Sequence, residues 1–174
     1  EIKQGLNRFT ANQTFSSYLQ KSYCKTASLM ANSCQAAGVL SAIPEDQLKC
    51  LHQFGKQLGL AFQVVDDILD FTGNDKQLGK PTSSDLASGY LTAPALYALE
   101  EHESLKVMIN REFSNSGDLE KSLELIKDSQ ALSRSIKLAE KFAKESLEAI
   151  SWLPESPCQN ALSKLPDFVL SRLY

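Results

Sequence analysis

The chain has 174 residues, and a hydrophobic share of 43% excludes a disordered chain. Its formal net charge of −3 lacks the basic excess that is typical of nucleic-acid-binding proteins. No apolar run approaches the roughly 20 residues that a membrane-spanning helix needs. The 4 cysteines are far apart and form no CxxC pair, which favours free thiols in a reducing compartment.

The predicted elements, in chain order, are all helical. The spacing of apolar residues predicts a helix over 14–40 and a second over 44–71, whose first turn is acidic. A polar loop over 78–85 follows, in which Ser84 or Asp85 can cap the next helix. Further helices are predicted over 91–101 (with Pro94 in its first turns), 104–113, 118–129, 132–152 and 160–173. No segment alternates apolar and polar residues as a strand would, so the predicted fold class is all-α.

The helix over 44–71 carries one polar stripe on an otherwise apolar surface. The stripe consists of Lys56, Gly59, Gln63, Asp66, Asp67 and Asp70, spaced three or four residues apart or adjacent. A helix that is apolar on nearly all sides is buried, and buried carboxylates are costly unless something compensates their charge.

A divalent cation would compensate that charge. All-oxygen ligands suit Mg²⁺ or Mn²⁺, and Mg²⁺ completes its coordination with waters and substrate phosphates. The stripe therefore predicts a cavity for a metal-bound phosphate, with Asp66, Asp67 and Asp70 as metal ligands. From periodicity alone, a solvated acidic face is an equally good interpretation.

Two lysines could supply positive charge to a bound phosphate. Lys80 lies in the loop after the acidic helix, and Lys25 lies inside the mostly apolar helix over 14–40. Each lysine, considered singly, is better explained as a surface residue whose ammonium reaches solvent. Together with the acidic stripe, both lysines become candidates for binding a phosphate.

Several motifs together resemble the trans-type polyprenyl diphosphate synthases, and most closely the long-chain, solanesyl-type enzymes of plants and cyanobacteria. The segments that carry the resemblance are KTASL at 25–29, FG at 54–55, LGLAFQ at 58–63, DDILD at 66–70, LGKP at 78–81, SDL at 84–86 and LTAP at 91–94. The order FQxxDDxxD, GKP, D and TAP is highly specific, since terpene cyclases share DDxxD but not its continuation. The resemblance extends over the whole chain, as one part (1–174) of a single polyprenyl synthase domain.

The resemblance implies an all-α helical bundle of the isoprenoid synthase type with a central cavity. Two aspartate-rich motifs share Mg²⁺ ions across it, and Asp66, Asp67 and Asp70 match the second motif, with Asp66 as a direct metal ligand. Ionisation of an allylic diphosphate leaves a carbocation, which the double bond of isopentenyl diphosphate attacks. The residues expected to take part are Asp66, Lys25 and Gln63 in catalysis and Lys25, Thr26, Gln63 and Lys80 in substrate binding.

The sequence departs from the family pattern at two places. Tyr90 stands where many members have a lysine ahead of the Thr-x-Pro motif. No DDxxD lies upstream of Lys25, so the first aspartate-rich motif is absent. We therefore expect a C-terminal half that lacks the family's N-terminal helices, with Glu1 at a cut edge and apolar surface exposed where those helices would pack.

Three functional hypotheses follow. The first is a prenyltransferase part that is inactive as this chain alone. The second is a non-catalytic, truncated partner or regulatory subunit of a full-length synthase, and the third is an unrelated helical scaffold with an acidic surface stripe. The first two imply a homo- or hetero-oligomer with a synthase subunit. The resemblance favours the chloroplast, with the mitochondrion and the cytoplasm as alternatives.

Overall fold

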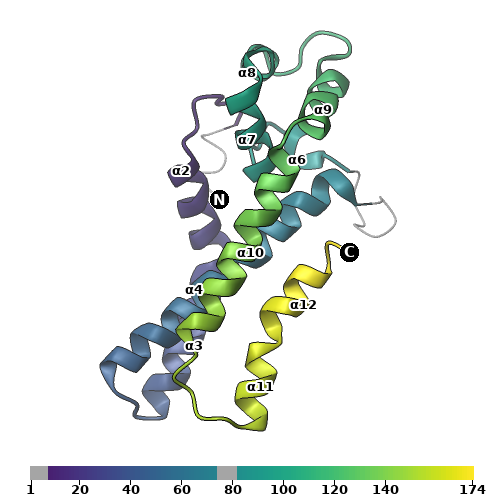
Figure 1. Cartoon of the computed structure of the whole chain (residues 1–174). Helices are drawn as coiled ribbons and strands as arrows, with labels where there is room; N and C mark the ends of the chain where they lie inside the picture. Colours follow the sequence, from purple (N-terminus) through teal and green to yellow (C-terminus); the bar gives the residue numbers. More distant parts are fainter. Residues whose placement is uncertain (1–7, 74–81) are drawn as a thin grey trace. The chain divides into compact units, whose positions relative to one another are not determined.

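A computed structural model of the chain describes residues 8–73 and 82–174. All regular elements in these ranges are helical, which confirms the all-α prediction (Figure 1). They are α2 (Phe15–Ser22), the π-helix η1 (Tyr23–Ala27), α3 (Ser28–Leu40), α4 (Glu45–Thr72), α6 (Ser84–Ala87), α7 (Ala93–Glu101), α8 (Glu103–Asn110), α9 (Asp118–Asp128), α10 (Ala131–Ala149), α11 (Pro157–Ser163) and α12 (Leu165–Ser171). None of the described helices is long and apolar enough to cross a bilayer.

The chain forms two compact units. The first comprises Glu1–Lys21 and Asp66–Lys137, and the second comprises Ser22–Val65 and Leu138–Tyr174. Two long helices contribute to both: α4 passes from the second unit into the first, and α10 passes from the first into the second. Every predicted site residue on α4 therefore belongs to one continuous helix.

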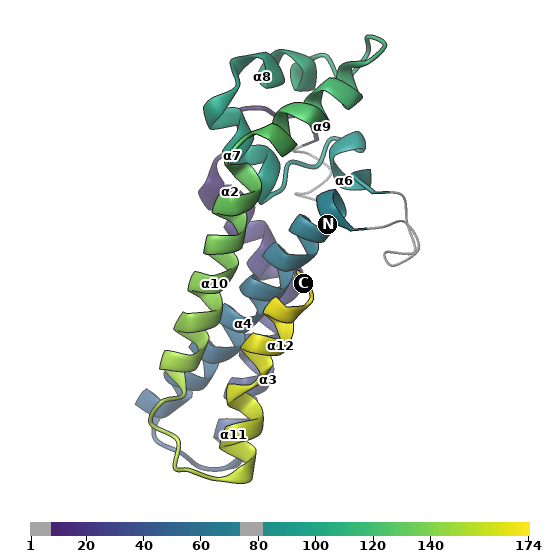
Figure 2. The ribbon, with the colours of Figure 1, turned by 45° about the vertical axis from the view of Figure 1, so that its right-hand side comes forward.

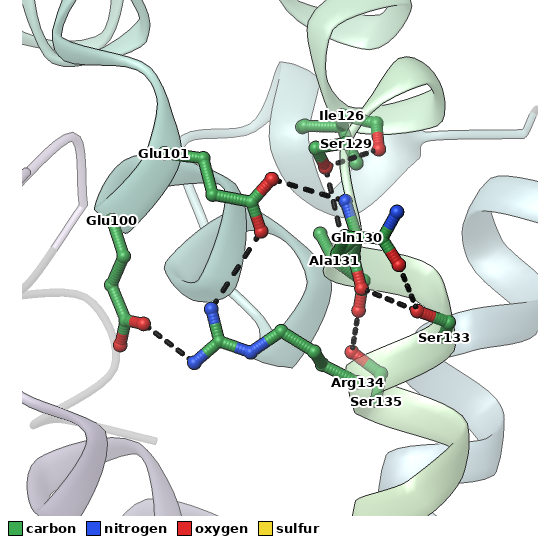
Figure 3. A network of polar contacts seen from close by, with 9 residues as sticks. All are labelled: Glu100, Glu101, Ile126, Ser129, Gln130, Ala131, Ser133, Arg134 and Ser135. Atoms are coloured by element: carbon green, nitrogen blue, oxygen red, sulfur yellow. Dashed lines mark hydrogen bonds and ion pairs between the residues drawn. The ribbon is translucent and has the colours of Figure 1, made fainter.

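In the first unit, α7, α8 and α9 contact one another and enclose an apolar core (Figure 2). Its fully buried side chains include Leu86, Leu91, Leu105, Ile109 and Ile126. The start of α10 is joined to α7 by Arg134, whose guanidinium lies over the ring of Tyr97 at 4.1 Å. Figure 3 shows the ion pair of Arg134 with Glu100, at 2.6 Å. Glu101 also accepts a hydrogen bond from the backbone N–H of Gln130. One arginine thus joins two helices through both its ring contact and its ion pairs.

In the second unit, α4 packs closely against η1 and α3 at glycine positions. A Cβ atom added to Gly59 would lie 2.5 Å from the Cα of Ala27, and one added to Gly55 would lie 2.5 Å from the carbonyl oxygen of Met30. Real Cβ atoms do not approach backbone so closely. The glycines therefore allow the two helical segments to lie nearly in backbone contact, which fixes the η1 turn beside α4.

Three predicted elements differ from the structure. The helix over 14–40 contains a wide π-turn at Tyr23–Ala27, because its backbone hydrogen bonds change register there. The predicted final helix over 160–173 is instead α11 followed by α12, and Pro166 in the first turn of α12 lacks the N–H that would continue α11. The predicted polar loop over 78–85 lies partly outside the described residues, and its last two positions begin the short helix α6.

The predicted cap of the helix over 91–101 is also wrong: Thr92 occupies the N-cap position of α7, and Ser84 and Asp85 lie in the short helix α6, which the sequence had not predicted. Ser83, in a left-handed conformation with φ of 60°, occupies the N-cap position of α6 and makes no side-chain capping bond. Ser84 and Asp85 lie within the helix and bond to α4 instead. The remaining predicted helices match α4, α7, α8, α9 and α10 to within about three residues at either end.

Candidate functional site

The acidic stripe lies on a buried part of α4, as its apolar flanks predicted. Ala61, Val64 and Val65 are fully buried, and Ile68 is 1% exposed. Acidic residues in the first turn favour the helix at its N-terminus, whereas the three aspartates of the stripe lie in the last turns, near the C-terminus. Negative charge is unfavourable there, so the carboxylates need specific partners.

Asp67 is held by a tyrosine of α2. Its side chain is 3% exposed, and its Oδ2 accepts a hydrogen bond of 2.6 Å from the hydroxyl of Tyr18, which is fully buried. Both residues belong to the first unit. The hydrogen bond joins α2 to α4 and stabilises a carboxylate that would otherwise be costly to bury.

Asp70 is held by the first turn of α6. Its side chain is 1% exposed, its Oδ1 accepts a hydrogen bond of 3.2 Å from the Ser84 hydroxyl, and its Oδ2 accepts one of 3.2 Å from the backbone N–H of Asp85. The backbone N–H of Ser83 also donates to the Asp70 carbonyl oxygen. Asp70 therefore accepts hydrogen bonds from the first turn of α6, as an N-cap side chain of that helix would. The same bonds connect α4 to α6.

Asp66 differs from the other two aspartates because it is half-buried rather than buried. Within residues 8–73 and 82–174, no group of three or more His, Cys, Asp or Glu side chains is arranged to hold a metal ion. A Mg²⁺ ion, which commonly takes one or two protein carboxylates and fills its shell with water and phosphate oxygens, fits this donor chemistry. Asp66 is the most accessible of the three aspartates for such an ion.

Two other predicted residues meet in the second unit. The hydroxyl of Thr26, in the η1 turn, donates a hydrogen bond of 2.7 Å to Oε1 of Gln63 on α4. The close approach at Gly59, one turn before Gln63, brings η1 near enough for this bond. Lys25 is exposed in the same turn. Thr26 and Gln63 therefore form one polar pair, which the sequence had predicted as separate positions.

The loop that contains Lys80 lies outside the described residues. The role of Lys80 as a diphosphate-binding residue therefore stays a prediction, as do the roles of Lys25, Thr26, Gln63 and the aspartates. The four cysteines, by contrast, are free thiols, as predicted.

Several site-forming residues were not predicted from the sequence. Tyr18 lies 49 residues from its partner Asp67, and only its place among apolar neighbours of a helix signalled burial. Arg8 lies over the ring of Tyr90 at 5.7 Å, and its Nε donates a hydrogen bond of 2.7 Å to the carbonyl oxygen of Ser88. A guanidinium thus lies beside the position where the family pattern has a lysine, and no local sequence signal indicated it.

The helical fold, the aspartate stripe and the Thr–Gln pair can now be compared with those of known proteins. Residues 1–126 match the family model described as "Polyprenyl synthetase". The chain belongs to the polyprenyl synthetase family, and this membership confirms the resemblance that its motifs indicated.

Known relatives are similar over the whole chain. A "Prenyl transferase" of Synechocystis sp. is 50% identical over 100% of this chain and 54% of its own length. "Solanesyl diphosphate synthase 2, chloroplastic" of Arabidopsis thaliana is 41% identical over 99% of this chain and 42% of its own length. The chain thus spans about half the length of the curated relatives it matches.

Solved structures share the fold. Heptaprenyl diphosphate synthase from Staphylococcus aureus matches with a TM-score of 0.92 and 30% identity, over 99% of this chain and 55% of that chain. A medium/long-chain length prenyl pyrophosphate synthase of Arabidopsis in its apo form matches with a TM-score of 0.86 and 34% identity. The predicted isoprenoid synthase type of fold is therefore confirmed.

Proposed function

We propose that the chain is part of a trans-polyprenyl diphosphate synthase and holds the diphosphate of an allylic substrate while isopentenyl diphosphate condenses with it. Family membership and the relatives named prenyl transferase or solanesyl diphosphate synthase support this assignment. The observation that carries it is the acidic stripe of α4, in which two carboxylates are buried and bonded while Asp66 is half-buried.

Mg²⁺ or Mn²⁺ is the proposed cofactor, with Asp66, Asp67 and Asp70 on the helix face that would hold it. When bound, such an ion would neutralise charge that develops on the departing diphosphate. Asp66 would supply the direct ligand oxygen. Asp67 and Asp70 would keep the stripe in place through their hydrogen bonds to Tyr18 and to the first turn of α6.

The Thr26–Gln63 pair would orient polar atoms toward the reacting ends of the substrates. Because Thr26 donates to Oε1 of Gln63, the amide of Gln63 is held in one orientation. Lys25, exposed in the same π-turn, can place its ammonium near a diphosphate. Lys80 is proposed as a further diphosphate ligand on the basis of its motif.

A non-catalytic role beside a full-length synthase is the second candidate. Large apolar side chains are exposed on α3 and α12, among them Leu29 at 75%, Leu40 at 89% and Phe168 at 69%. An apolar surface of this kind favours association with further polypeptide. We accordingly propose that the chain works in a homo- or hetero-oligomer with a synthase subunit, in the chloroplast as the names of the Arabidopsis and rice relatives suggest.

A radiolabel assay separates the two candidates. The chain is incubated with Mg²⁺, labelled isopentenyl diphosphate and an allylic diphosphate, alone and together with a relative that is inactivated at its own second aspartate-rich motif. We expect no long-chain product from the chain alone and restored product from the mixture.

Asp66→Ala should abolish this rescue, whereas Asp128→Ala, which changes an exposed aspartate of α9, should leave it intact. Product from the chain alone would contradict the expected inactivity. Rescue that survives Asp66→Ala would favour the non-catalytic partner.

A further inference from the structure

The ring of Tyr18 is held rigidly inside the first unit. The residue is fully buried, Phe15 packs against its ring edge-on with centroids 5.4 Å apart, and the Lys21 ammonium lies 5.6 Å from the ring centroid. The three residues lie one turn apart on α2 and its end. With its ring enclosed in this way, the phenol hydroxyl occupies a fixed position.

That hydroxyl bonds to a buried carboxylate. The distance of 2.6 Å between Tyr18 Oη and Asp67 Oδ2 is in the range of charge-assisted O–H···O⁻ bonds. The Asp67 side chain is 3% exposed, so solvent contributes little to its stabilisation. The hydrogen bond from α2 therefore contributes to the direction of the Asp67 carboxylate.

Asp66 is the immediate neighbour of this bonded carboxylate. Asp66 and Asp67 are consecutive on α4, and Asp70 is fixed one turn later by the first turn of α6. If Asp67 could rotate, its charge could approach that of Asp66 and disturb any cation bound there. Groups that orient metal ligands from outside the coordination shell commonly affect metal affinity by about 10–100-fold.

We infer that Tyr18 is a positioning residue for the cation site: its hydroxyl holds Asp67 in one direction and thereby maintains the geometry in which Asp66 takes a divalent cation. The inference rests on the proposed function, since it presupposes a cation at Asp66. It assigns a role to a helix that carries none of the aspartate-rich motif.

Titration of the chain with Mn²⁺, followed by the electron paramagnetic resonance signal of the free ion, tests the inference. Tyr18→Phe keeps the ring and removes only the hydroxyl, and it should weaken Mn²⁺ binding about tenfold while the circular dichroism spectrum stays unchanged. Tyr97→Phe is the matched control, because the contacts of Tyr97 to Phe15 and Arg134 involve its ring. The control should change the affinity less than about twofold.

A double variant shows whether Tyr18 acts through Asp67. In an Asp67→Ala background, Tyr18→Phe should cause no further loss of Mn²⁺ affinity, because the bond is already absent. The inference would be overturned if the folded Tyr18→Phe variant bound Mn²⁺ as tightly as the unchanged chain, or if Tyr97→Phe lost as much affinity. Either result would leave the proposed function standing. Absence of Mn²⁺ binding by the unchanged chain would overturn the cation site of the proposed function, and the inference with it.

Discussion

The two units of the chain are stabilised in different ways. The first unit is rich in polar bonds between its elements: Tyr18 with Asp67, Asp70 with the first turn of α6, Arg111 with Asp118, and Arg134 with Glu100. Among the large apolar side chains that are exposed, only Val107 at 55% lies in the described part of this unit.

The second unit depends more on close helix packing and leaves more apolar surface in solvent. Its helices meet at Gly55 and Gly59, and the described residues contribute six exposed large apolar side chains, namely Leu29, Val39, Leu40, Leu165, Phe168 and Tyr174. Polar partners thus satisfy Asp67 and Asp70 within the first unit, while the second unit has the surface suited to contact with further polypeptide.

Gly59→Val should have the largest effect on stability. Its Cβ would lie 2.5 Å from the Cα of Ala27, so the helices of the second unit must move apart. We expect a loss of about 3 kcal/mol in the free energy of unfolding, measured by urea denaturation. Gly117→Ala in the first unit is the control: nothing lies within 4 Å, and only its φ of +83° opposes alanine, at about 1 kcal/mol. Equal losses of unfolding free energy in the two variants would show that close helix packing does not distinguish the second unit from the first.

Asp70→Ala should have the next largest effect. The change leaves the Ser84 hydroxyl and the Asp85 backbone N–H without their carboxylate acceptor. We expect a loss of about 2 kcal/mol, seen as a lower urea midpoint. Asp128→Ala, at an exposed position of α9, should change the midpoint little. If both variants behave alike, Asp70 does not fasten α6.

The Arg111–Asp118 pair should make the first unit sensitive to acid. The Arg111 guanidinium, which donates hydrogen bonds to the Asp118 carboxylate, lowers the pKa of Asp118. A carboxyl group whose pKa is lower in the folded chain stabilises that chain above the ordinary carboxyl range, and the contribution disappears as the pH falls through the lowered pKa. Arg111→Ala should therefore reduce the urea midpoint at pH 7 and much less at the acid end.

The matched variant is Lys106→Ala, which breaks an exposed pair with Glu103 at 3.8 Å on the preceding helix. Lys106→Ala should change the urea midpoint little at pH 7 and at acid pH, because exposed ion pairs contribute little to the free energy of unfolding. A loss in Arg111→Ala that is equal at neutral and acid pH would contradict the assignment of the effect to Asp118 ionisation.

Leu40→Lys should have the smallest effect on stability and a clear effect on association. Leu40 is 89% exposed on α3, so the free energy of unfolding should change by no more than about 0.5 kcal/mol. Light scattering should show less self-association than for the unchanged chain. Val107→Lys, at 55% exposure in the first unit, should leave the scattering unchanged. A similar decrease in both variants would show that apolar exposure in general, and not the second unit, drives association.

Much of the fold could be predicted because the helices carry local signals. Apolar spacing located α4, α7, α8, α9 and α10. The π-turn at Tyr23–Ala27 could not be predicted, since apolar spacings of three and four residues are compatible with either hydrogen-bond register. The break before α12 was missed although the sequence carries a signal for it, because Pro166 would lie in the interior of a helix over 160–173, where proline breaks or kinks the helix.

The candidate site could be predicted only in part, for a related reason. The stripe pattern predicted that Asp67 and Asp70 are buried, and both are. It showed their charge but not their partners, because the donors lie on other helices: Tyr18 is 49 residues away from Asp67, and Ser84 is 14 residues away from Asp70. Long-range hydrogen bonds leave no periodic signature in a single sequence.

The π-turn has a consequence for how the family can vary. A π-helix turn closes its hydrogen bonds over five residues instead of four, so it accommodates one more residue than an α-helical turn. Loss of one residue between Tyr23 and Ala27 would restore ordinary winding without breaking the helix. Deletion of a single residue is therefore compatible with a continuous helix at the turn that carries Lys25 and Thr26.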